Sequence, residues 1–311
     1  MKKASILLIF ILATFYLFDR ATYLFLLKLD SSVFSGQDVG KTNLFFKEKD
    51  SVNVIVFGSS RASHHFNNNL LNISSFNMGM DGRKIDFVDA LVSTLNRQGQ
   101  IILVHVDPDE IITKSQGVSN SARVLANYYL RDQSLRSYFN KYQFLDASII
   151  RFAHTYSYNG KALGILKNYF FPQTKLLKNK GYEPLFPTET QKEILTKQYS
   201  ALNLDTLPNS DITLRETSIN YEEHLTNILE KCARNRARLI FFSSPTLVPY
   251  NGPSVKGYFD NRQLEYYDYS NYFNYYQPED WKDLSHLSSI GAEKFSTKLI
   301  EEIVLSEEIK Y

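Results

Sequence analysis

Four short runs of residues, most of them strongly apolar and each followed closely by glycine, serine or proline, constrain the fold of this 311-residue chain most. They cover residues 52–57, 74–77, 101–106 and 239–243. Short runs that do not alternate with polar residues are typical of parallel strands buried on both faces. The sequence therefore predicts a buried, mostly parallel sheet.

Segments with helical spacing of apolar residues follow or precede these strands, at residues 82–96, 221–236 and 290–305. Strands that alternate with helices favour a parallel sheet with helices on both faces. We therefore expect an α/β domain over residues 51–311.

A long stretch without strand signals separates the third and fourth predicted strands, at about residues 111–216. Its first part is helical in pattern, at residues 123–130, 134–145 and 148–153. We interpret the stretch as a helical insertion that forms a lid over the carboxyl ends of the strands, where α/β folds bind ligands.

The N-terminus carries Lys2 and Lys3 and then an apolar run, residues 4–18, which resumes at residues 21–27 after Asp19-Arg20. Together the two pieces are long enough to span a bilayer. The lysines favour a cytoplasmic N-terminus. We predict an uncleaved single-pass anchor over residues 1–28, with the domain periplasmic or on the cell surface.

A cleaved signal peptide is the alternative, and it would make the domain a secreted one. Both interpretations export the domain. The polar residues 29–50 are expected to form a stalk or a first surface helix that leads into it.

Composition excludes several classes of function. A net charge of +2 gives no reason to expect a nucleic-acid partner. The single cysteine, Cys232, excludes an internal disulfide and a multi-cysteine zinc site, and its helical context favours a buried structural thiol. His64 or His65 with Asp107 or Asp109 lacks any recognised metal-ligand spacing, so we predict no metal and no cofactor.

The first sequence element that could take part in catalysis is the end of the first strand, where Gly58, Ser59 and Ser60 follow the apolar run. Glycine permits a sharp turn, and a serine that begins the next helix exposes its hydroxyl at the strand edge that forms active sites. Taken alone, such a serine is most often a helix cap.

The second element lies near the C-terminus, where Asp283 and His286 precede the last helix. A carboxylate three residues before a histidine can orient the imidazole and stabilise its protonated form, as a catalytic triad requires. A capping aspartate beside a surface histidine is the alternative.

Taken together, the two elements resemble the SGNH (GDSL-type) serine hydrolase superfamily. Gly58-Ser59-Ser60 matches the nucleophile block, usually Gly-Asp-Ser, and Asp283 to His286 match the Asp-x-x-His block, with Gly291 and Ala292 one residue further along than usual. Residues 76–79, Phe-Asn-Met-Gly, match a second block. The resemblance covers residues 52–311 and is closest to cell-envelope proteins with a Gly-Ser-Ser block.

The resemblance implies a flavodoxin-like three-layer α/β/α fold with about five strands, and a triad of Ser60, His286 and Asp283. The family's Gly-x-Asn-Asp block, whose asparagine donates to the oxyanion, is missing after the third strand. The oxyanion would then depend on the backbone N–H groups of Ser60 and Gly79, with Arg61 or Asn77 assisting.

Other polar residues have simpler explanations. His65 is a candidate for lining the site, whereas His105 lies in an apolar strand and is expected in the core. Asp107, Asp109 and Glu110 at a strand end could bind a cation or cap the next helix, and we expect the cap. Eight tyrosines between residues 250 and 276 suit sugar stacking or an aromatic packed loop.

We therefore predict a serine esterase or O-acyl (acetyl) transferase that acts on an ester of a cell-envelope glycan, or on another small ester. The alternative is a non-catalytic envelope protein of the same fold that binds glycan or a partner in polysaccharide assembly. A third possibility is that the serine and the Asp-x-x-His element do not meet in space.

Overall fold

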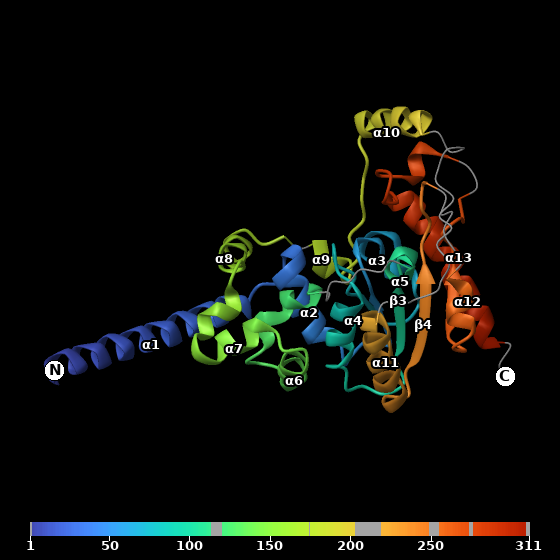
Figure 1. The fold of residues 1–311 in the computed structure, drawn as a ribbon. Helices are drawn as coiled ribbons and strands as arrows, with labels where there is room; N and C mark the ends of the chain where they lie inside the picture. The colour runs from blue at the N-terminus through green and yellow to red at the C-terminus, as the bar shows by residue number, and fades with distance from the viewer. Residues whose placement is uncertain are drawn as a thin grey trace.

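The structure is a computed structural model that describes residues 2–112, 120–173, 175–202, 219–248, 255–273 and 276–308. Its centre is a sheet of five parallel strands in the order β2-β1-β3-β4-β5 (Figure 1). The predicted α/β fold is confirmed. The strands are β1 Val54–Phe57, β2 Ser75–Asn77, β3 Ile101–His105, β4 Arg238–Ser243 and β5 Glu265–Asp268.

The strand order reverses direction at β1, because β2 lies on one side of β1 and β3 on the other. Crevices that bind ligands in open α/β sheets form at such switch points, beyond the carboxyl ends of the strands. In this chain the switch point is occupied by the residues that follow β1 and β3. These include Ser59, Ser60 and Asp107.

Strand residues alternate between two hydrophobic cores. Ile55 and Phe57 face a core shared with α2 (Lys41–Glu48), α4 (Ile85–Val92) and α11 (Ile219–Arg234). Val54 and Val56 face the opposite core, which is shared with α3 (Ser60–His65) and α13 (Ser289–Glu308). Because both faces are covered, the central strands β1, β3 and β4 are apolar at most positions.

Two elements differ from the sequence-based expectation. The segment expected to be a stalk or surface helix forms a π-helix, Gly36–Gly40, and then α2, whose Leu44 and Phe45 are buried in the core. The fifth strand, β5, lies within the tyrosine-rich stretch. It has no apolar run, since it begins with glutamate and ends with aspartate, and it forms the edge of the sheet.

The insertion is helical, as predicted, but its first half does not form a lid. It packs against α4 and the N-terminal helix instead of over the strand ends (Figure 1). Its elements, with the short helices that flank it, are α5 Pro108–Ile112, a 3₁₀ helix η3 Ser121–Tyr128, α6 Gln133–Lys141, α7 Leu145–Phe152, a 3₁₀ helix η4 His154–Tyr158, α8 Ala162–Phe170, α9 Lys175–Lys178 and α10 Glu189–Ala201.

The N-terminal helix α1 runs without interruption from Lys2 to Asp30, and its N-terminal part projects away from the domain (Figure 1). It is long and apolar enough to cross a membrane, and both a signal anchor and a signal peptide fit that description. The remaining short elements are the 3₁₀ helices Asn68–Leu70 and Pro278–Asp280 and the helix α12 Lys256–Asp260.

Candidate active site

Ser60 is the first residue of α3 and lies directly after the turn that ends β1. Gly58 adopts a φ of +142°, and a Cβ there would lie 2.8 Å from the Cβ of His105. Only glycine therefore fits this turn without displacing β3. Ser59 caps α3 by accepting a hydrogen bond from the N–H of Arg61. The capping serine, Ser59, and the candidate nucleophile, Ser60, are thus different residues.

Asp283 and His286 lie on a short loop that begins at Trp281 and ends at Leu287, two residues that form an antiparallel bridge. The N–H of Lys282 donates to the carbonyl of His286 at 2.8 Å, which closes the loop. The Asp283 carboxylate also accepts the backbone N–H groups of Ser285 and His286. This local bonding fixes the carboxylate beside the imidazole.

The three predicted side chains meet in the structure. His286 Nε2 lies 3.0 Å from Ser60 Oγ, although the two residues are 226 positions apart in the chain. His286 Nδ1 lies 3.0 Å and 3.1 Å from the two carboxylate oxygens of Asp283. With the Nδ1 proton donated to Asp283, Nε2 is left to accept the Ser60 hydroxyl proton.

The charge of Asp283 suits this arrangement. Burial acts to raise its pKa, but the hydrogen bond from His286 and those from the backbone of Ser285 and His286 outweigh burial and hold the pKa below its ordinary value. The carboxylate is consequently ionised near neutral pH, where it can stabilise an imidazolium.

His65 does not line the cleft. It is fully buried, and its Nε2 accepts the N–H of Leu287 at 3.0 Å, directly after His286. Its Nδ1 therefore carries the proton and donates to Ser244 Oγ at 2.8 Å, and Ser244 in turn bonds to His105 Nε2 at 2.9 Å. Thus His65 supports the triad loop from beneath, which corrects the expectation that it contacts substrate.

Asn77 and Gly79 do not face the reacting oxygen either. The fully buried Asn77 amide donates to the carbonyls of Ala62 and Phe66, and its oxygen accepts the N–H of Gly79 at 2.9 Å. The N–H group expected in the oxyanion hole already has an acceptor. Both residues instead seat α3 against β2.

Arg61 does line the cleft, but its guanidinium pairs with Asp107 at 2.8 Å. The other oxygen of Asp107 accepts the Ser59 hydroxyl at 3.0 Å. Asp107 thereby ties the turn after β3 to the turn after β1, a role that differs from the helix cap expected. The N–H of Ser60 remains as the backbone donor beside the nucleophile, because the first amides of a helix have no intrahelical acceptor.

The cleft that Ser60 and His286 line is open to solvent and has a volume of about 410 Å³. Four other residues of its wall, Gly82, Arg83, Lys84 and Glu110, were not predicted to line the site. Gly82 has a φ of +66°, so the Asp81-Gly82 turn signal could have located this wall. The first half of the insertion contributes no residue to the lining.

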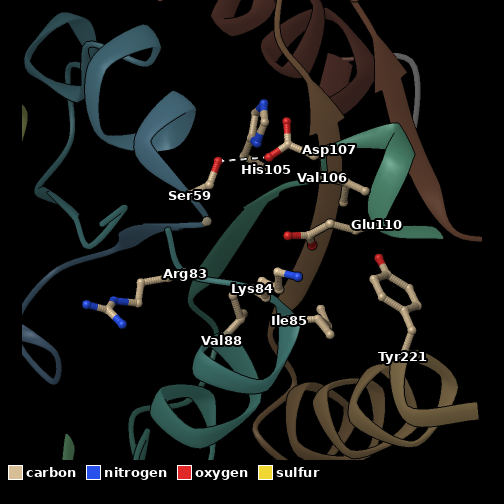
Figure 2. A pocket seen from close by; sticks show the side chains of 11 residues that line it. Ser59, Arg83, Lys84, Ile85, Val88, His105, Val106, Asp107, Glu110 and Tyr221 are labelled. Atoms are coloured by element: carbon tan, nitrogen blue, oxygen red, sulfur yellow. Dashed lines mark hydrogen bonds between the residues drawn. The ribbon is translucent and has the colours of Figure 1, made fainter. Parts of the chain in front are cut away.

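A small enclosed cavity adjoins the cleft beneath Ser59 (Figure 2). Among the residues that the structure describes, no protein group bonds to three buried atoms of its lining residues: Arg83 Nε, His105 Nδ1 and Tyr221 Oη. Glu110 also lines the cavity, and burial together with nearby Asp107 raises its pKa to about 8. A protonated Glu110 therefore adds a hydrogen-bond donor to this wall at neutral pH.

The remaining candidates have structural surroundings. Cys232 is buried, and burial raises the pKa of its thiol to about 12, so it is an inert thiol. His224 pairs with Asp89 in the core. Of the tyrosine-rich stretch, Tyr258, Tyr266 and Tyr269 are buried, which favours the packed-loop interpretation, whereas Tyr250 and Tyr275 lie outside the described residues.

Over the described ranges, no group of three or more histidine, cysteine, aspartate or glutamate side chains is placed to hold a metal ion. No protein-family model matches the chain, and no curated protein matches its sequence. The chemistry of the site must therefore be argued from its own geometry.

Proposed function

We propose that the protein is a serine esterase or O-acyl transferase of the SGNH type. The observation that carries the proposal is the continuous line of hydrogen bonds from Ser60 through His286 to Asp283. It opens onto a cleft large enough for a small ester. A cap alone does not explain it, since Ser59 already caps α3.

The reaction follows from the roles of the three groups. Ser60 Oγ attacks the ester carbonyl carbon as its proton passes to His286 Nε2, and the imidazolium then gives that proton to the departing alcohol. The acyl-enzyme is resolved by water in hydrolysis or by a sugar hydroxyl in transfer. In both cases His286 takes the proton of the incoming oxygen and returns it to Ser60 Oγ as the bond between Ser60 and the acyl group breaks.

We propose an ester of a cell-envelope glycan as the substrate, because we infer that α1 remains attached as an anchor and holds the domain outside the membrane. The C-terminal half of α1 supports this inference. Its Tyr23, Leu26 and Leu29 are buried in the domain, and Asp30 is fully buried. Cleavage after the second apolar piece, at residue 27, would remove Tyr23 and Leu26, which the domain packs against.

The alternative is a non-catalytic envelope protein that binds glycan or a partner. The bond between Gly79 N–H and Asn77 favours it, because loss of one oxyanion donor can lower a rate by about 10²–10³-fold. Turnover distinguishes the two, since a binding protein has no need of an activated serine.

The test is hydrolysis of p-nitrophenyl acetate by the full chain in detergent. We expect measurable release of p-nitrophenolate, and a loss of at least about 10³-fold in kcat for Ser60→Ala. Ser137→Ala, at an exposed position of α6, is the matched control and should keep full activity. Equal turnover by Ser60→Ala and the control would exclude the mechanism.

A further inference from the structure

The C-terminal half of α1 and the insertion are joined by specific polar contacts. The Asp19 carboxylate accepts the backbone N–H of His154 at 2.9 Å and that of Thr155 at 3.0 Å, which caps η4. Arg20 pairs with Asp19 and also donates to the carbonyl of Phe152 at 3.4 Å. The C-terminal end of α7 is therefore bonded to α1 at residue 20.

Apolar packing fixes α8 slightly further along α1. Ile165 of α8 is fully buried in one cluster with Tyr23, Leu26 and Leu29. Two neighbouring segments of the insertion thus lie beside residues 19–29 of α1. Figure 1 shows α7 and α8 on either side of this part of the helix.

The outer surfaces of these two segments are strongly apolar. Phe152 at the end of α7 is 80% exposed, and Leu163 and Phe170, one face of α8, are 82% and 66% exposed. Phe171 follows at 74%, and Leu24 and Phe25 are exposed on α1 itself. We call these six residues the interfacial surface. Such a gathering on a water-soluble domain is unusual unless something covers it.

The length of α1 indicates what covers it. About 20 helical residues cross the hydrocarbon core of a bilayer, so a span that begins at Ala4, after Lys2 and Lys3, ends near Leu24. Arg20 lies sixteen positions after Ala4, or about 24 Å at 1.5 Å per residue. The backbone of Phe152, bonded to Arg20, and α8, packed on residues 23–29, therefore lie at the outer boundary of that core.

We propose that the interfacial surface is inserted into the outer interface of the bilayer that α1 crosses. Phenylalanine and leucine side chains enter the acyl boundary, while the exposed amines of Lys28 and Lys167 on the same helices reach phosphate headgroups. This proposal rests on the anchor inferred above. Its consequence is that the active site stands at a fixed height and tilt above the membrane.

Depth-dependent quenching tests the proposal on the full chain. Cysteines that replace Phe152, Leu163 or Phe170, one per variant, are labelled with an environment-sensitive fluorophore, while native Cys232 is buried and is measured alone as the background. The labelled chains are placed in proteoliposomes of phosphatidylcholine and phosphatidylglycerol that contain nitroxide-labelled lipid. The matched control is Phe186→Cys, because Phe186 is similarly exposed, at 69%, but lies on the segment that leads to α10, away from α1. Phe10→Cys, within α1, reports whether the helix spans the bilayer.

We expect strong quenching at Phe10 and at all three surface positions, at least about threefold above that at Phe186. If position 10 is quenched but the three surface positions are quenched no more than position 186, the proposal is overturned and the anchor remains supported. Absence of quenching at position 10 overturns both the anchor and the insertion of the interfacial surface. Neither result depends on esterase activity, which is measured separately, so failure here is distinguishable from failure of the triad.

Discussion

At the scale of single residues, two histidines beneath the cleft are held neutral. Burial, reinforced by neighbouring cationic groups, lowers the pKa of His65 well below its ordinary value. Burial also lowers the pKa of His105 to about 4, although the nearby charge of Asp107 opposes this shift. Since His65 holds the N–H of Leu287, protonation of this pair disturbs the loop that carries His286.

The direction of the pH effect follows from linkage. In the unfolded chain a histidine binds a proton below about pH 6.5, whereas folded His105 stays neutral down to about pH 4. Between about pH 6.5 and pH 4 the unfolded state therefore binds more protons than the folded state. The contribution of neutral His105 to stability is fully present above about pH 6.5 and is lost as the pH falls towards 4.

We predict that His105→Gln, which keeps an acceptor for Ser244, reduces this loss. Between pH 6.5 and 5 the free energy of unfolding of the wild-type chain should fall by about 2 kcal/mol more than that of the variant, at about 1.4 kcal/mol per pH unit. Urea unfolding at several pH values measures the difference. Parallel pH profiles would show that His105 is not held neutral. Glu110, whose pKa is raised, acts in the opposite direction but is common to both proteins.

At the scale of elements, the position of α3 depends on how closely it approaches the loop after β2. A Cβ added at Gly79 would lie 2.4 Å from the backbone nitrogen of Ser63 and 2.7 Å from the Cβ of Ala62. Both atoms belong to α3, which carries Ser60 at its first position. The glycine is needed for contact between elements and not for a φ value.

We predict that Gly79→Ala lowers the free energy of unfolding by about 1–3 kcal/mol, because α3 must shift, and lowers esterase turnover as well. Gly164→Ala in α8 is the matched control. Nothing lies within 4 Å of a Cβ there, so the substitution should be neutral or stabilise by about 0.5–1 kcal/mol. Thermal unfolding and p-nitrophenyl acetate turnover measure both effects. A Gly79→Ala protein as stable and active as the control would contradict the account.

Elements with a local signal were predictable from sequence. The runs of β1, β3 and β4 are apolar on both faces, and Ser60, Asp283 and His286 each lie beside a turn that the sequence marks. The roles of Asn77, Gly79 and His65 were not predictable, since each depends on a bond to a residue brought close by the fold. β5, Glu-Tyr-Tyr-Asp, has no apolar run, and α2 has only a short one, so neither the strand β5 nor the burial of α2 was marked by a local pattern.

At the scale of the whole molecule, the C-terminal part of α1 and the domain form one body. Asp30, at the end of α1, is fully buried and lies 2.6 Å from Arg131 of the insertion, and it also accepts hydrogen bonds from Asn43, Asn127 and Tyr158. No flexible stalk intervenes between α1 and the sheet. The first half of the insertion, which was expected to form a lid, instead connects the N-terminal helix to the side of the α/β domain.

The central claim is that Ser60 is an activated nucleophile, and covalent labelling tests it most directly. The folded full chain is treated with a fluorophosphonate, and the modified peptide is identified by mass spectrometry. We predict a single adduct on Ser60 that is lost in His286→Ala and kept in Ser137→Ala. A folded protein without an adduct on Ser60, or with equal labelling after removal of His286, would contradict the account.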